Sequence, residues 1–392
     1  MKTIHTYIVG DMMKTFVFAF IVFSFVLTII TMISMTLQEN VPPVRLLEMI
    51  PFIIIVVAPI TIPMTLLLAV TSTLARVSGN NEIVALKALG IPPWRVLWPV
   101  LVLAFVMSVA CVWANDWAVT SGRANIAKIG FSAFEDMVLS AVRQDGIYTF
   151  PGGVGWITAK GVNNKTMIGV TIFMKKEATT ISAQQASLRI DTARQMLLVS
   201  LYGIKAGEGN NVTYDAPEEH IEFSLERFGK SSGKSNRASD MGLRELPEAM
   251  ERDRQQIESG RRYMAAQQAF ATILGKPENL VSADWKMASA NTEAAKVRLD
   301  RYAVEPPRRW ANGFCCLFFV WVGAPLAVWM KKADIFASFF AVFIPILLFF
   351  YPFLAIGTSL AKSGTLPAEG VWIANAALGV AGIWFWKNIH RY

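Results

Sequence analysis

The chain is poor in the residue types that usually carry chemistry: it has three cysteines and three histidines among 392 residues. All three cysteines, Cys111, Cys315 and Cys316, fall inside apolar runs. They show neither the spacing of a metal site nor that of a disulfide framework for an exported domain. We therefore expect them to pack as small apolar side chains.

Charge is also scarce, because only 17% of the residues are charged and 54% are hydrophobic. Soluble proteins have nearer a quarter charged residues, so this composition is outside their norm. The apolar residues gather in six blocks, each long enough to cross a bilayer. These blocks are Thr15–Leu37, Met49–Ala75, Val96–Asn115, Trp310–Met330, Ile335–Ala361 and Pro367–Trp386. The sequence predicts a helical membrane protein with six transmembrane helices in a 3+3 arrangement.

The cores of these six blocks contain no Asp, Glu, Lys, Arg or His. Each such residue costs about 2.5–3.5 kcal/mol at a helix centre and is kept where an ion path or catalysis needs it. Their absence argues against a proton-coupled carrier, an intramembrane metalloprotease and a redox pump. The net charge of +8 does not indicate nucleic-acid binding, since no basic stripe with interleaved aromatics is present.

Basic residues mark one side of the membrane. The flanks on that side hold Lys2, Lys14, Arg76, Lys87, Arg95, Lys331, Lys332, Lys387 and Arg391. The short loops on the other side hold only Arg45 and Lys362. By the positive-inside rule, we expect both termini and the segment Ser78–Pro93 to be cytoplasmic, and residues 116–309 to lie outside.

The outer segment is predicted to begin with a β domain at residues 119–229, either a β-jelly-roll or a sandwich. It follows residues 1–118, which hold the first three spans and the short cytoplasmic segment between the second and the third. Short strand-like runs extend from Gly146 to Phe228 and are separated by Gly, Asn and Pro clusters. The alternation of Ile221, Phe223 and Leu225 with polar residues is typical of a half-buried strand. Val170, Ile172 and Met174 form one apolar strand face. This face either lines a lipid path or fills a closed core.

Residues 230–305 are predicted to be a linker and a polar helical insertion, before the last three spans at 306–392. The linker GKSSGKSNRASD resembles a phosphate loop only superficially, because its glycines are one residue too close. From Pro247 to Tyr302 the composition is helical and charged, with a break at Gly275-Lys276-Pro277. A surface helical hairpin is expected there.

Between spans two and three, SGNNEIVALKALGIPP (Ser78–Pro93) predicts a short helix at residues 80–90 with its own start and stop signals. Asn80 or Asn81 can cap its start, and Glu82 places an acid in the first turn. Gly90 fits the stop position and the following prolines prevent continuation. Ile83, Leu86 and Leu89 form one apolar stripe. Such a helix either docks on a partner protein or lies on the lipid headgroups.

Three stretches carry a resemblance to a known family: Ile62–Leu101 with its N-E-I-x-A-L-K-A-x-G-I helix, Gly357–Asn375, and Tyr7-Ile8-Val9. Together with the order of spans and β domain, they resemble the lipopolysaccharide-export permease family of the LptF/LptG type. The polar helical insertion is longer than that family leads us to expect.

The resemblance implies a transmembrane subunit of an ABC transporter that extracts lipopolysaccharide from the inner membrane of a bacterium. Its implied partners are a second permease subunit, a cytoplasmic ATPase dimer, a periplasmic bridge protein and a single-span subunit. ATP is then bound by the partner ATPase, and no cofactor by this chain. The short helix is implied to be the coupling helix, with Glu82, Ile83, Ala85, Leu86, Lys87 and Gly90 on its motif. We assign Ile83 and Leu86 to the ATPase contact, and Glu82 and Lys87 to its rim.

Lipid phosphates need cations near the outer leaflet, and Arg45, Arg308 and Arg309 lie on the outer flanks. They are candidate phosphate ligands, or else anchors that reach the interface from span ends. Two other functions stay open. A mechanical transmitter would move the outer domain without passing lipid. A membrane-anchored hydrolase would need a base, and the outer domain offers only His220.

Overall fold

The computed structural model describes residues 2–39, 43–149, 155–163, 166–174, 179–191, 196–208, 211–224, 238–275, 283–330 and 335–389. The chain divides into two compact units. The helical unit comprises residues 1–27, 54–120 and 241–392, and the β unit comprises residues 28–53 and 121–240. We describe each unit by itself.

The prediction of six membrane spans is confirmed. The structure has six helices that are long and apolar enough to cross a bilayer among its described residues. They are α1 (Lys2–Glu39), α2 (Pro43–Gly79), α4 (Pro93–Trp117), α7 (Ala283–Trp329), α8 (Ile335–Lys362) and α9 (Ile373–Ile389), and α9 follows a short 3₁₀ turn, η6 (Ala368–Trp372). The three cysteines are buried and unbridged, which agrees with their predicted role in packing.

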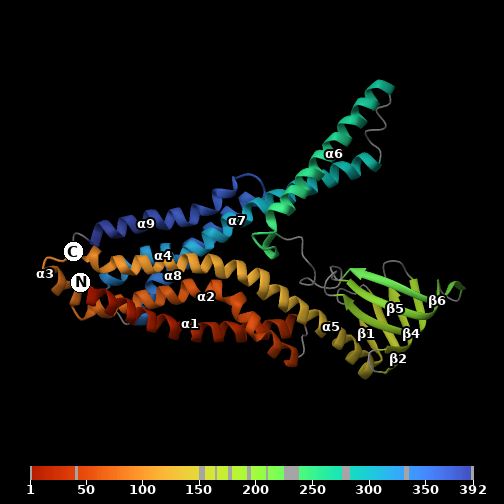
Figure 1. The fold of residues 1–392 in the computed structure, drawn as a ribbon, viewed down its shortest axis with the longest axis horizontal. Helices are drawn as coiled ribbons and strands as arrows, with labels where there is room; N and C mark the ends of the chain where they lie inside the picture. Colours follow the sequence, from red (N-terminus) through yellow and green to blue (C-terminus); the bar gives the residue numbers. More distant parts are fainter. Residues whose placement is uncertain are drawn as a thin grey trace. The chain divides into compact units, whose positions relative to one another are not determined.

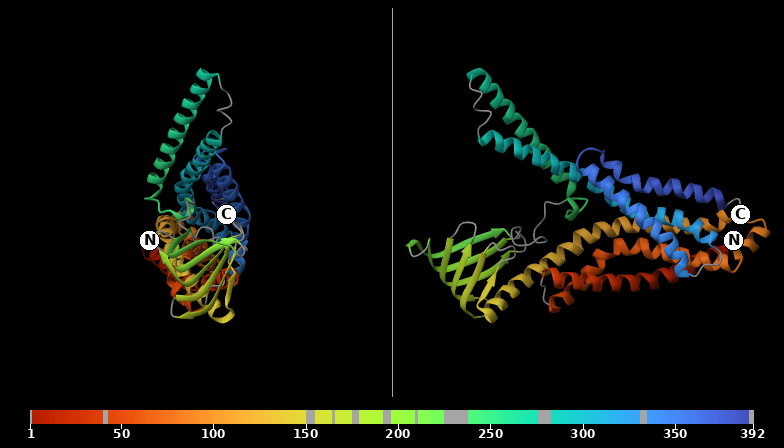
Figure 2. Two further views of the ribbon diagram at one scale, coloured as in Figure 1. Left: turned by 90° about the vertical axis from the view of Figure 1, so that its right-hand side faces the viewer. Right: turned by 180° about the vertical axis from the view of Figure 1, so that it is seen from behind.

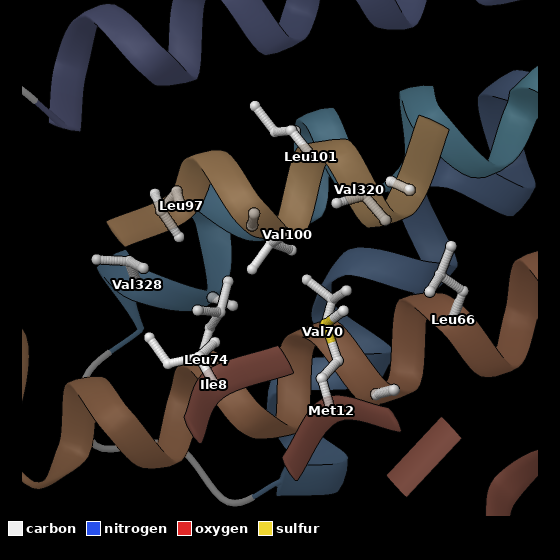
Figure 3. Packing of buried hydrophobic residues seen from close by; sticks show 14 of the residues in the cluster. Ile8, Met12, Leu66, Val70, Leu74, Leu97, Val100, Leu101, Val320 and Val328 are labelled. Carbon is white, nitrogen blue, oxygen red and sulfur yellow. The ribbon is translucent and has the colours of Figure 1, made fainter. Parts of the chain in front are cut away.

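The core of the helical unit forms where α1, α2, α4 and α7 meet (Figure 3). Met12, Val70, Val100 and Val320, one from each helix, are fully buried in it. A polar contact crosses the same core, since the backbone N–H of Leu317 donates to Ser108 Oγ over 3.0 Å. Lipid tails are as apolar as these side chains, so close packing and interhelical hydrogen bonds hold the spans together.

One glycine lets α7 approach α4 closely. A Cβ atom on Gly313 would lie 2.2 Å from Val112 Cγ2 and 2.9 Å from the Val112 nitrogen. We predict that Gly313→Ala lowers the thermal midpoint of the detergent-solubilised protein, because overpacking costs about 1–3 kcal/mol. Gly10→Ala in α1 is the matched control, since a Cβ atom added at Gly10 would meet nothing within 4 Å. A Gly313→Ala midpoint equal to the wild type would contradict this packing.

A long helical hairpin precedes the fourth span. α6 (Leu246–Leu274) ends at Gly275 and packs beside the first part of α7, as Figures 1 and 2 show. Arg298 Nη2 binds Asp253 Oδ1 across the two helices at 2.9 Å. The structure thus contains the expected hairpin; Lys276 and Pro277 lie outside the described residues. α7 does not stop at the boundary expected at 305/306 but continues through Pro306 and Pro307 as one helix of 47 residues.

The β unit holds a single antiparallel sheet of six strands in chain order (Figure 2). Its strands are β1 (Ile147–Thr149), β2 (Gly155–Asn163), β3 (Thr166–Met174), β4 (Thr179–Asp191), β5 (Met196–Glu208) and β6 (Asn211–Ser224). The predicted β insertion is confirmed. Its described strands form one sheet and not two facing ones, because each strand pairs with the next along the chain. Leu225 and the linker GKSSGKS lie outside the described residues.

The first part of the segment expected to be β is helical. α4 continues past Asn115 into a π-helix, η1 (Ala118–Arg123), and then into α5 (Ala124–Asp145). Val138, Leu139 and Val142 of α5 pack on one face of the sheet, where Val170 and Ile172 are buried. These two strand residues therefore lie in the closed core of the β unit. The side chain of Met174 is not among those described.

Candidate functional site

The short helix between spans two and three is α3 (Glu82–Ala88). Asn81 precedes it with φ 62°, a left-handed conformation that asparagine tolerates better than most residues. A capping side chain needs an extended backbone at this position, so Asn81 makes no side-chain cap and that prediction is wrong. Asn80 does not cap either; its Nδ2 donates to Glu82 Oε1 over 3.2 Å.

The end of α3 agrees with the prediction. Gly90 has φ 79°, which glycine adopts without strain. The N–H of Gly90 donates to the Lys87 carbonyl over 2.9 Å, and that of Ile91 to the Leu86 carbonyl over 3.0 Å. This pair of bonds is a Schellman motif. Pro92 is then extended and α4 begins at Pro93.

The two apolar faces of α3 differ in exposure. Ile83 is only 6% exposed and belongs to the core of the helical unit, and Leu86 packs against that core. The spans themselves therefore supply a docking site for Ile83, which argues against its predicted contact with a partner. Leu89 is 77% exposed and Val84 44% exposed, and Ala85 is also exposed. These residues present the free apolar surface of α3.

A groove of about 470 Å³ runs between α3 and the start of α1. Its walls are mostly apolar, and Glu82 supplies one acidic group. The lining residues are Tyr7, Ile8, Val77, Glu82, Ala85, Leu86 and Leu89. Nearby contacts fix this end of the bundle: Asp11 pairs with Arg76, and Ser78 Oγ donates to the Val328 carbonyl over 2.9 Å. The groove is thus built on rigid helix ends.

Arg309 lies in a buried ion cluster that also contains Asp116, Glu305 and Arg308. Arg309 is 1% exposed, and its Nη1 donates to Asp116 Oδ1 over 2.8 Å and its Nε to Glu305 Oε1 over 3.3 Å. Nη2 donates to the Met241 carbonyl, and Asp116 Oδ1 also accepts the N–H of Leu243 at 2.9 Å. The guanidinium is therefore used within the chain, which argues against Arg309 as a phosphate ligand.

Arg308 is placed differently, because it lines a pocket of about 430 Å³ between α7 and α8. Its Nε and Nη2 donate to Glu305 at 3.0 and 2.5 Å. Its Nη1 has no hydrogen-bond partner among the described residues. Lys362 at the end of α8 lines the same pocket. Glu305 is fully buried and binds both arginines. Arg309 lies in the protein interior, and Arg308 lies at the wall of the pocket.

The remaining candidate, Arg45, lies near the start of α2 in the β unit and pairs with Glu48 at 3.1 Å. It is not among the residues that line the pocket of Arg308. Lys362 stands out in the sequence only as a basic residue beside a span. That it lines the same pocket as Arg308 depends on how α7 and α8 pack, which no local pattern reveals.

Comparison with known proteins identifies the family of the chain. The model of the family "Lipopolysaccharide export system permease LptF/LptG" matches residues 6–388. The comparison with curated proteins gives no match. The matched residues include α3, the groove beside it and the pocket of Arg308 and Lys362. The chain therefore belongs to the LptF/LptG family and is a permease of the lipopolysaccharide-export ABC transporter.

Proposed function

We propose that this permease pairs with a second permease subunit on a separate cytoplasmic ATPase dimer, and that the complex passes lipopolysaccharide to a periplasmic bridge. The observation that supports this most is the pair of sites at opposite ends of the helical unit. One end carries the exposed apolar residues of α3, and the other carries a pocket with two cationic side chains.

The membrane orientation follows from the same arrangement. The two ends of the described chain and α3 lie at one end of the helix bundle (Figure 1). Most of the basic residues that flank the spans belong to the loops and termini at that end of the bundle. By the positive-inside rule, we assign that end to the cytoplasm. The Arg308 pocket and residues 116–309 then lie on the periplasmic side.

In this proposal, α3 transmits force through its two faces. A helix of seven residues is marginal alone in water. Ile83 and Leu86 anchor it to the spans, so a displacement of α3 moves the helices on which it packs. Leu89, Val84 and Ala85 contact the ATPase, and Glu82 and Lys87 lie at the edge of that contact. This assignment replaces Ile83 with Leu89 as the main partner contact.

The lipid route is set by the cost of exposing hydrocarbon. Bringing an acyl chain of roughly a dozen methylenes into water costs on the order of 10 kcal/mol, at about 0.8 kcal/mol per CH₂. The chains must therefore stay against apolar surface. α8 offers such a surface, which extends from the pocket towards the middle of the membrane. Its residues Leu348, Phe353 and Ile356 are well exposed. A phosphate held at Arg308 and Lys362 would leave the acyl chains along this face.

We predict that the double variant Arg308→Gln, Lys362→Gln lowers lipopolysaccharide-stimulated ATPase activity at least tenfold while the complex still assembles. Hydrogen bonds to charged groups contribute about 1.5–3 kcal/mol each, which corresponds to such a loss. Stimulation is measured in nanodiscs with and without lipopolysaccharide. Arg262→Gln in α6, whose side chain is 77% exposed, serves as the control. Full stimulation in the double variant would exclude the pocket as a phosphate site.

The wider proposal is tested by purifying the intact membrane complex and identifying its proteins and lipids by mass spectrometry. We expect an ATPase and bound lipopolysaccharide in the same preparation. A complex that contains the ATPase but no lipopolysaccharide, and that shows no transfer of it to a bridge protein, would favour a purely mechanical transmitter.

A further inference from the structure

Three tryptophans meet where α4, α7 and α9 pack together. The ring centroid of Trp94, at the start of α4, lies 4.9 Å from that of Trp386 in α9. The centroid of Trp386 lies 5.4 Å from that of Trp321 in α7, and Trp94 and Trp321 are 6.4 Å apart and edge to face. Trp386 is only 6% exposed and belongs to the core of the helical unit, so the three rings form a packed cluster inside the protein.

The indole N–H of Trp386 fills a gap in the hydrogen bonding of α7. Pro325 lies inside this helix and has no N–H, so it cannot donate to the carbonyl of Trp321 four residues earlier. Nε1 of Trp386 donates to that same carbonyl over 3.0 Å. α9 therefore supplies the donor that α7 lacks.

Trp321 in turn binds α9. Its Nε1 donates to the Gly379 carbonyl over 3.3 Å. A Cβ atom on Gly382 would collide with the Trp321 ring, so the close approach of the two helices requires a glycine there. Trp321 and Trp386 thus exchange hydrogen bonds with each other's helix, which fixes α7 to α9 just before the proline.

The gap at Pro325 separates two parts of α7 that have different contacts. The last turn, after the proline, is bound to the end of α2, because Ser78 Oγ donates to the Val328 carbonyl over 2.9 Å. The part before the proline extends to Arg308 at the outer pocket, about 20 Å from Trp321 at 1.5 Å per residue. A proline inside a helix removes a backbone bond and favours bending at that point. A displacement of the last turn would then be absorbed at Pro325 unless another group stiffens the helix there.

We infer that Trp386 is a positioning residue for coupling between the ATPase and the outer pocket: its bond to the Trp321 carbonyl makes α7 move as one body across Pro325. The inference rests on the proposed function of α3 as the ATPase contact. Leu86 of α3 and Trp94 both pack against the core that contains Trp386. A displacement of α3 therefore acts directly on the tryptophan cluster, and α7 carries it outward.

The first test removes the donor and keeps an aromatic ring. Trp386→Phe should lower the lipopolysaccharide-stimulated ATPase activity of the full complex in nanodiscs about fivefold, a factor typical of the loss of one hydrogen bond. Trp384→Phe makes the same chemical change at a residue of α9 that is 61% exposed, and it should leave stimulation at the wild-type level. Co-purification of the ATPase is recorded for each variant.

The second test gives the donor back from within α7. Pro325→Ala supplies a backbone N–H to the Trp321 carbonyl, so this variant alone should keep the wild-type stimulation. In its background, Trp386→Phe should change stimulation less than twofold. A role in ring packing alone predicts the same loss in both backgrounds, because the substitution removes the same part of the ring in each. An equal loss in both backgrounds, or no loss in either, would overturn the inference.

Assembly is judged by the same comparison. If Trp386→Phe assembles only together with Pro325→Ala and is then stimulated normally, the missing bond is the cause and the inference holds. If it assembles in neither background, ring packing is the cause and the inference is wrong. The proposed function fails by a different result, namely that Leu89→Asp still binds the ATPase. If Leu89→Asp loses the ATPase while Trp386→Phe keeps full stimulation, the proposed function stands and Trp386 has no part in coupling.

Discussion

Arg309→Ala is expected to destabilise the permease by about 3–5 kcal/mol, the cost typical of removing one partner from a buried ion pair. Glu305 is fully buried and Arg309 is 1% exposed, so Glu305 keeps only Arg308 as its cation when Arg309 is removed, and water does not replace the lost guanidinium. Asp116 also loses its cation, and the Met241 carbonyl loses a donor. The measurement is the thermal midpoint of the detergent-solubilised permease, which should fall by many degrees.

Arg262→Ala is the control for this prediction. Arg262 pairs with Glu258 on the surface of α6, with side chains 77% and 64% exposed. Exposed pairs of this kind contribute about 0–1 kcal/mol, so the midpoint should hardly change. If Arg309→Ala keeps the wild-type midpoint and loses lipid stimulation, the arginine is a ligand and the buried cluster is not structural.

The features that the sequence predicts well are those encoded by neighbouring residues. A run of twenty apolar residues specifies a span wherever it packs. The end of α3 follows from Gly90 and Pro92 alone, because left-handed backbone and a missing N–H are local requirements. The hairpin break at Gly275 has the same local origin. These predictions needed no knowledge of the tertiary structure.

The features that the sequence does not determine concern which partner a side chain finds. Ile83 and Leu89 look equivalent on one apolar stripe, yet one is buried in the spans and the other is free. Arg309 and Asp116 are 193 residues apart in the chain. The sequence does hold one signal. Asp116 follows the third span and Arg308 and Arg309 precede the fourth, so all three are expected at the outer side of the membrane. Sequence position alone could not decide between pairing with each other and binding a phosphate.

The proposed role of α3 leads to a pair of variants, one expected to affect partner binding and the other the stability of the fold. Leu89→Asp should weaken binding of the ATPase at least tenfold, because it places a charge at the most exposed apolar residue of the α3 surface. The thermal midpoint of the isolated permease should not change, since Leu89 is 77% exposed. Recruitment is measured by co-purification of the ATPase and by the ATPase activity of the complex.

Ile83→Asp is the matched variant at the buried position of α3. It buries an unpaired carboxylate in the core of the helical unit, so the midpoint of the isolated permease should fall before any effect on the ATPase is considered. The contrast between the two variants tests the division of α3 into an anchoring face and a partner face. If Leu89→Asp recruits the ATPase normally, α3 does not use this surface, and the motor must engage the spans elsewhere.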